Sequence, residues 1–122
     1  MSYDKSKSDI VEVLTNLGFS QAPVNKKVSE DFRPNTFSIN KVERVIQMHN
    51  HIKSYKFDIE IAFVVNSNDS VDEAQLFFDN IIDKISNIDR FLSYSSNPQI
   101  KQTRDIKKII GSLSFYIDNS YC

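Results

Sequence analysis

The chain has 122 residues, of which 40% are hydrophobic and 25% are charged, a balance typical of one soluble globular domain. Its 15 lysine and arginine residues nearly cancel its 16 acidic residues, for a formal net charge of −1, so no whole-chain field attracts it to nucleic acid or to an anionic membrane. Its 2 glycines form no glycine-rich turn, and the phosphate-binding patterns GxGxxG and GxxxxGK(S/T) are absent. These counts argue against nucleotide-dependent chemistry of those kinds.

The residues at the two ends of the chain indicate in which cellular compartment we expect the protein. The polar N-terminal stretch "MSYDKSKSDI" lacks the apolar run of a signal peptide, and no apolar segment approaches the ~20 residues that span a bilayer. The single cysteine, Cys122, cannot close an internal disulfide, which fits a reducing compartment or a fold that needs no crosslink. We therefore expect a soluble intracellular chain with no membrane partner.

A first helix is predicted over residues 7–17. Ser6 and Asp9 have the spacing of a capping box, and apolar residues then recur at helical intervals, namely Ile10, Val13, Leu14 and Leu17. Gly18 can take the left-handed conformation that closes the last turn, which would let Phe19 fold back onto the apolar stripe.

The segment of residues 20–35, called the arm below, is polar, contains Pro23 and Pro34, and has no sustained period. It predicts an extended arm or a loose hairpin. Among the aromatic residues, only Tyr3 and Phe32 stand in a polar context that suggests exposed anchors. Because a long segment without periodicity often orders on a neighbouring molecule, we expect an interface that includes Phe32, Arg33 and Asn35.

Two long strands are predicted next. Residues 36–46 alternate like a strand at their start but also fit a helical stripe further on, and we favour a strand from Thr36 that continues or bends through Ile46. Residues 55–65, "YKFDIEIAFVV", would extend about 36 Å at ~3.3 Å per residue, well beyond a usual strand. Every odd position is apolar, whereas the even positions change from charged to apolar, in the order Lys56, Asp58, Glu60, Ala62 and Val64. We expect the charged positions to face solvent and the dry end to lie under a helix and near a protein partner.

A second helix is predicted over residues 70–88, where Ser70 and Glu73 form a capping box before a broad apolar stripe. Phe78 and Ile82 lie on that stripe and should face the sheet. Residues 69–89 contain only Lys84 as a cation against six acids, namely Asp69, Asp72, Glu73, Asp79, Asp83 and Asp89. Paired carboxylates can act as general acid and base, but capping and the helix macrodipole explain acids at this place.

The C-terminal part predicts a strand at residues 91–95, the loop "SSNPQIKQTRD", and a last long strand over residues 106–118. The fold class is therefore α+β, a mostly antiparallel sheet with two helices packed on it and long strands suited to ring assembly. A basic patch lies in residues 101–108, formed by Lys101, Arg104, Lys107 and Lys108 with only Asp105 as an acid. No aromatic residue is interleaved to stack on bases, which favours a solvated or partner-binding face over a nucleic-acid site.

No set of residues indicates catalysis. His49 and His51 have no third metal ligand nearby at a suitable spacing, and a zinc site needs three or four. The sequence has no glycine-flanked nucleophile elbow, and its only histidines are these two, so a Ser-His-acid triad has little to be built from. We predict no enzyme, catalytic residue, metal or cofactor. Two alternatives remain: a small nucleic-acid or regulatory binding module that uses residues 101–108, and a small hydrolase or metal enzyme that uses the two histidines.

The order of elements resembles the tail terminator, or tail completion, proteins of tailed bacteriophages. The resemblance covers most of the chain: a short N-terminal helix, a proline-bearing arm ("DFRPNTFSI"), a long alternating strand ("YKFDIEIAFVV"), a helix with an acidic start ("SVDEAQLFFDNIIDKI") and a final strand ("IIGSLSFYID"). Residues 40–54 depart from it, because they fit no clear strand.

The resemblance implies a structural virion protein of one domain that forms a homo-hexameric ring. Such rings cap the head-proximal end of the tail tube, stop its growth and join it to the head or neck. The implied partners are further copies of the chain, the tail tube protein and a head-completion or neck protein, without sequence-specific nucleic acid. The implied location is the virion tail, after assembly in the host cytoplasm. We expect the interfaces to involve Phe32, Arg33, Asn35, Lys101, Arg104 and Lys107.

Overall fold

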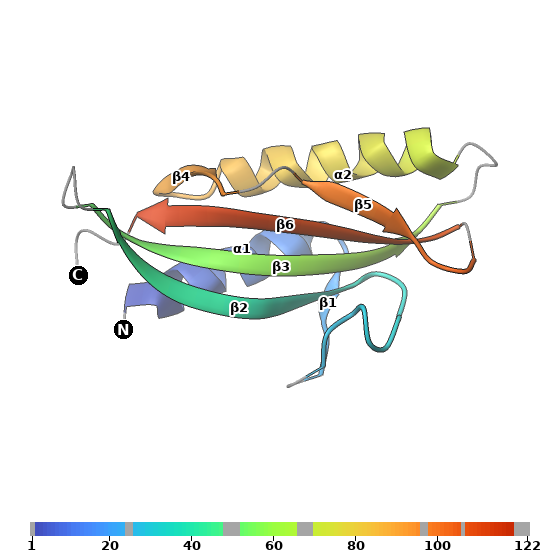
Figure 1. Cartoon of the computed structure of the whole chain (residues 1–122), viewed down its shortest axis with the longest axis horizontal. Coiled ribbons are helices and arrows are strands. Elements are labelled where there is room, and N and C mark those ends of the chain that lie inside the picture. The colour runs from blue at the N-terminus through green and yellow to red at the C-terminus, as the bar shows by residue number, and fades with distance from the viewer. Residues whose placement is uncertain are drawn as a thin grey trace.

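The computed structural model describes residues 2–23, 26–47, 52–65, 70–95, 98–105 and 107–118. It has the predicted α+β fold, with two helices and a six-stranded, mostly antiparallel sheet. In chain order the elements are α1 (Ser2–Asn16), β1 (Ser20–Gln21), β2 (Thr36–Gln47), β3 (Ile52–Val64), α2 (Ser70–Ser86), β4 (Phe91–Tyr94), β5 (Gln99–Gln102) and β6 (Lys108–Asp118) (Figure 1). Neither described helix combines the length and apolar character required to cross a membrane.

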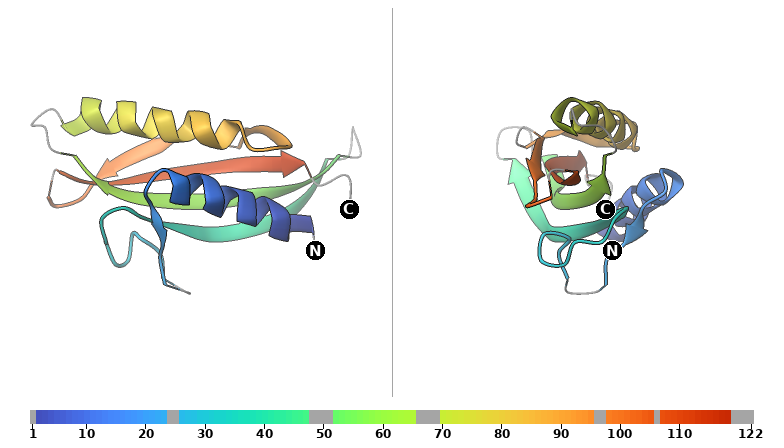
Figure 2. Two further views of the ribbon diagram at one scale, coloured as in Figure 1. Left: turned by 180° about the vertical axis from the view of Figure 1, so that it is seen from behind. Right: turned by 90° about the vertical axis from the view of Figure 1, so that its right-hand side faces the viewer.

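The sheet has the strand order β1-β2-β3-β6-β4, and β5 pairs with β6. All pairs are antiparallel except β1 with β2. β4 pairs with the C-terminal part of β6 and β5 with its N-terminal part, so the two short strands follow one another along the same edge. Both helices cover one face of the sheet, as seen from behind and from the end in Figure 2. The opposite face is called the outer face below.

The core forms between the helices and the alternate residues of the long strands. The register of β3 and β6 places Phe57 opposite Phe115 on the helix side, with ring centroids 5.9 Å apart. Phe78 of α2 is 0% exposed and lies against Gly111 of β6. Ile82, the other residue predicted to face the sheet, is half-buried and packs against the same core. The apolar alternation of β3 and the stripe of α2 are therefore confirmed as the two sides of one core.

The C-terminal end of α1 matches the prediction, whereas its start does not. Gly18 has a φ of 97°, and the backbone N–H of Phe19 donates to the carbonyl of Leu14 at 3.0 Å, which is the closing bond of a Schellman motif. Phe19 is buried in the core, as predicted. The predicted start at residue 7 is wrong, because the helix begins at Ser2; an i,i+4 ion pair of 3.5 Å between Lys5 and Asp9 supports the additional turn.

The strand preferred for residues 36–46 is confirmed and extends to Gln47, with a β-bulge between Ile39 and Lys41. That bulge interrupts the alternation and explains why the segment also fits a helical pattern. The second helix begins at residue 70 as predicted but ends at Ser86 rather than at 88. The segment "SSNPQIKQTRD" is not only a loop, because Gln99–Gln102 pairs with β6 as β5. His49, His51 and Cys122 lie outside the described residues.

Candidate partner-binding surface

The arm folds back onto the outer face of its own sheet. After β1, the N–H of Ala22 donates to the carbonyl of Phe37 at 2.7 Å. Val28 is fully buried, and its N–H donates to Ser38 Oγ at 3.3 Å. The hydroxyl of Ser29 donates to Glu60 Oε1 at 3.0 Å. The arm is thus held by contacts within one chain, and a neighbour is not required to order it.

The side chains of β3 on the outer face differ in burial along the strand. The charged residues Lys56, Asp58 and Glu60 are half-buried on the outer face, whereas Ala62 is fully buried. Ala62 does not belong to the main core cluster, and neither does Val28 of the arm, so both are buried apart from the helices. The prediction that a helix covers the C-terminal end of this strand is correct for Ile61, Phe63 and Val65, which belong to the core beneath the helices. Ala62, on the outer face, is buried by other parts of the same chain and needs no partner to cover it. Val64, next on that side, is 42% exposed.

The hairpin of β5 and β6 carries the basic patch. Its turn is fixed by the N–H of Thr103, which donates to the carbonyl of Lys108 at 3.0 Å, and by the N–H of Lys107, which donates to Asp105 Oδ1 at 3.1 Å. The single acid of the patch therefore serves the turn. The side chains of Lys101, Arg104 and Lys107 are exposed.

The arm and the hairpin, far apart in sequence, enclose a hollow of about 470 Å³ on the outer face. We call it the arm–hairpin groove; its lining residues are Ser29, Glu60, Lys101, Gln102, Thr103, Arg104, Ile110 and Ser112. A further contact joins its two sides, because Lys108 Nζ lies 5.7 Å from the centre of the Phe32 ring. The groove combines hydroxyls, a carboxylate and two cations around one apolar residue, Ile110, which suits a partner that carries acids beside an apolar side chain.

The structure places the six predicted interface residues in different roles. Lys101 and Arg104 line the groove, whereas Lys107 is exposed outside its lining. Phe32 is half-buried beneath Lys108 rather than a free anchor.

The other two arm residues hold the arm itself. Arg33 Nε lies 3.2 Å from Asp31 Oδ2 in an exposed ion pair. Asn35 has a left-handed φ of 59°, and its carbonyl accepts the N–H of Ser20 at 2.9 Å, so its evident role is to join the arm to β1.

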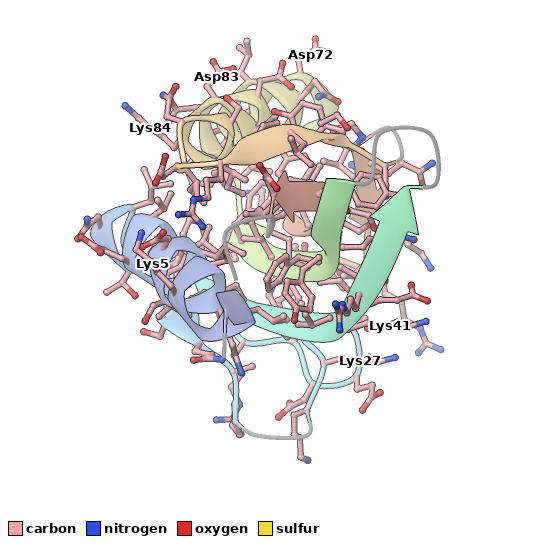
Figure 3. All side chains as sticks on the ribbon, turned by 90° about the vertical axis from the view of Figure 1, so that its left-hand side faces the viewer. Lys5, Lys27, Lys41, Asp72, Asp83 and Lys84 are labelled. Carbon is pink, nitrogen blue, oxygen red and sulfur yellow. The ribbon has the colours of Figure 1, made fainter. Side chains whose placement is uncertain are left out.

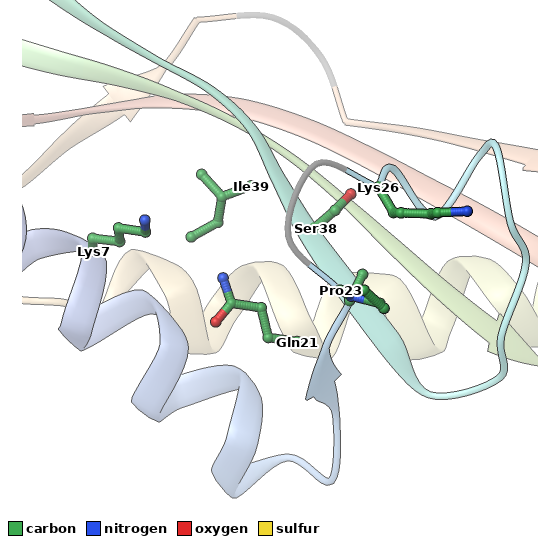
Figure 4. Close-up of a pocket in the computed structure, with 7 residues that line it drawn as sticks. Lys7, Gln21, Pro23, Lys26, Ser38 and Ile39 are labelled. Atoms are coloured by element: carbon green, nitrogen blue, oxygen red, sulfur yellow. The ribbon is translucent and has the colours of Figure 1, made fainter.

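A second hollow of about 460 Å³ opens between α1, β1 and β2, on the other side of the arm (Figure 4). Lys7 and Gln21 extend into it beside Ile39, whereas Lys26 points away. Its polar groups do not converge on one point. Nor do the described residues contain any group of three or more His, Cys, Asp or Glu side chains that could hold a metal ion.

Sequence reasoning missed the arm residue Ser29 and the sheet residues Glu60, Ile110 and Ser112 as parts of the groove. A signal for Ile110 existed, since it is an apolar residue on the even side of an alternating strand. No family model matches the sequence, and no curated protein matches it.

Proposed function

We propose that this chain is a structural protein that assembles into a ring, caps a phage tail tube and joins it to the head or neck. The observation that carries the proposal is a sheet that is open at two different edges. β2 pairs with β3 on one side, while β1 covers only its first residues, Thr36 and Phe37, on the other. The opposite edge is formed by β4 and β5, each of four residues. Two unlike edges support head-to-tail contacts between copies, and such contacts form a ring when the rotation closes.

The long strands and the charged edge support the same proposal. β2, β3 and β6 have 12, 13 and 11 residues, so they extend beyond a usual strand of ~5–6 residues and present surface to neighbours. On β2, Lys41 Nζ and Glu43 Oε2 are 3.8 Å apart. Charges on an edge strand oppose uncontrolled pairing, so an assembly at this edge would be selective. In the ring, the half-buried polar residues of the outer face would contact solvent, lumen or partner.

The test is the mass of the full chain, alone and with tail tubes polymerised from the tube protein of the same genome. We expect a closed oligomer, with six copies as the expected number, at one end of each tube, and tubes that stop growing when it binds. Native mass spectrometry would measure the mass of the oligomer, and negative-stain microscopy would show its place on the tubes and the tube lengths. A chain that stays monomeric and leaves tube growth unchanged would contradict the proposal.

Binding of nucleic acid is the second candidate, favoured by the exposed Lys101, Arg104 and Lys107. Against it, none of the described residues that line the groove is aromatic and able to stack on a base. A DNA affinity that falls steeply with salt would support this candidate. The two histidines on which the hydrolase or metal-enzyme alternative depends lie outside the described residues.

A further inference from the structure

The exposed side of α2 carries a leucine among acids. Leu76 is 73% exposed, with Asp72 four residues before it and Asp79 three residues after it. Asp83 follows on the same side, and Figure 3 shows Asp72 and Asp83 pointing away from the sheet. We call Asp72, Leu76, Asp79 and Asp83 the acidic surface.

Helix stability explains only part of the acidic surface. An acid in the first turn interacts favourably with the helix dipole, which accounts for Asp72. Asp79 accepts a hydrogen bond from Gln75 Nε2, one turn before it, at 2.8 Å, which stabilises the helix. Asp83 has no such explanation, because it lies in the half of the helix where the dipole disfavours an acid. Leu76 lies opposite the buried stripe of Ala74, Phe78, Ile81 and Ile85, so it contributes nothing to the core.

The chain carries a surface of opposite sign on the hairpin, formed by Lys101, Arg104 and Lys107, which we call the basic surface. The ion pairs of Lys5 with Asp9, Arg33 with Asp31, and Lys41 with Glu43 include no member of either surface. Asp79 accepts a hydrogen bond from Gln75 Nε2 at 2.8 Å, but its charge is not paired with a cation. Within the part of the chain that the structure describes, the charges of both surfaces therefore have no partner of opposite charge in the same copy.

The two surfaces lie on opposite sides of the sheet. Lys101 pairs with Ile110, which pairs with Ala62, and paired residues share a face, so this row belongs to the outer face. α2 packs on the other face, and its exposed side points further away. The surfaces cannot meet within one copy, but they can meet between two copies that stack back to front. That contact is heterologous, as a ring requires.

We propose that the arm–hairpin groove receives the acidic surface of α2 from a second copy, with Leu76 seated against Ile110 and the three aspartates facing Lys101, Arg104 and Lys107. The inference rests on the proposed ring and adds to the strand edges a second contact, between the hairpin that includes β5 and the exposed side of α2 in the next copy. Charge complementarity selects this occupant, and Leu76 supplies the apolar contact, because exposed ion pairs alone contribute little affinity. The charges would steer and register the copies.

Charge exchange tests the proposal on the full chain. Two triple variants should each weaken self-association at least tenfold at low salt. The first reverses the basic surface by Lys101→Glu, Arg104→Glu and Lys107→Glu, and the second reverses the acidic surface by Asp72→Lys, Asp79→Lys and Asp83→Lys. The chain that carries all six changes should associate again, to within about threefold of the wild type. Lys7→Glu, Lys26→Glu and Lys27→Glu, also exposed, provide a control with the same change in charge and should have little effect. Sedimentation across ionic strength measures association, and circular dichroism confirms folding.

Leu76→Ser should weaken association while melting stays as in the wild type, because Leu76 is 73% exposed. Unchanged association of either triple variant, failure of the six-fold variant to recover, or a wild type that remains monomeric at low salt and high concentration would overturn the proposal. Loss of DNA binding without loss of self-association would assign the basic surface to nucleic acid. If self-association recovers in the six-fold variant but the wild type does not cap tubes, the proposed function is refuted and the interface stands. If the wild type caps tubes but self-association does not recover in the six-fold variant, only this interface is refuted.

Discussion

Gly111→Ala is expected to destabilise the fold, because β6 and α2 touch at this residue. A Cβ added to Gly111 would lie 2.7 Å from Cε1 of Phe78 and 2.9 Å from Cδ1 and Cζ, closer than carbon atoms approach in proteins. The ring cannot move away freely, since Phe78 is 0% exposed and its ring centroid lies 6.5 Å from that of Phe63. α2 must therefore shift or the ring must leave its rotamer.

The magnitude follows from two opposing effects. Overpacking of this kind costs ~1–3 kcal/mol, and replacement of glycine by alanine in a strand returns ~0.5–1 kcal/mol of backbone entropy. The net loss is about 1 kcal/mol at the middle of the two ranges and about 0–2.5 kcal/mol at their extremes; the middle value lowers the melting temperature of a chain of this size by about 4–5 °C. Urea unfolding of Gly111→Ala would measure the first quantity, and calorimetry the second.

Two further variants make the test specific. Ser112→Ala, next along β6 on the outer face, has no ring above it in the main core and should melt within ~2 °C of the wild type. Phe78→Leu removes the clashing ring edge, so the cost of Gly111→Ala should shrink in that background, with a coupling of about 1 kcal/mol. If Gly111→Ala melts at or above the wild-type temperature, the close packing of α2 on β6 is wrong.

Three other changes probe the core, the arm and α2. Phe78→Ala should cost ~3–5 kcal/mol because the ring is fully buried, and Ile82→Ala should cost less than the usual ~2–5 kcal/mol because Ile82 is half-buried; equal losses in urea unfolding would contradict this order. Phe32→Ala should reduce assembly, measured by sedimentation, while the monomer stays folded, because the ring beneath Lys108 joins the arm to the hairpin beside the groove; normal assembly would show that this contact is not needed for the interface. Burial raises the pKa of Tyr94 above its ordinary value of 10.0, and its hydroxyl donates to the carbonyl of Ile82 at 3.3 Å. Since a raised pKa favours the protonated phenol in the folded state, its contribution is complete below pH 10 and is lost as pH rises through the folded pKa. Tyr94→Phe should therefore be less stable than the wild type at pH 8 and approach or exceed it at pH 11.

Local patterns were sufficient for the parts of the fold with a long apolar period. The alternation of residues 55–65 and 106–118 predicted most of β3 and β6, although β3 begins earlier, at Ile52, and β6 later, at Lys108. The stripe from Ala74 to Ile85 predicted α2, because such a pattern repeats over several turns. β5 was missed because its four residues contain one apolar side chain, Ile100, and its pairing depends on the register of β6. A single apolar residue has no period.

The groove could not be predicted because tertiary contacts create it. Ser29, Glu60 and Lys101 are brought together by the pairing of β3 with β6 and by the fold of the arm, and no local rule connects them. The sequence alone shows that residues 101–108 are basic. That Lys101 lies on the outer face of the sheet follows only from its pairing with Ile110. Composition therefore indicated the charge of the surface, and topology decided which partner surface it can meet.

An arm that is already ordered changes what assembly requires. A segment that folds on its partner loses conformational entropy at that moment, which weakens binding for a given interface. Here Val28 is buried, and Ser29 already donates to Glu60, so the groove exists before a second copy arrives. The free-energy cost of association then falls mainly on the long side chains of Lys101, Arg104 and Lys107, which are exposed. The rate of encounter should consequently depend on charge steering, and the lifetime of the contact on the seating of one apolar side chain, Leu76.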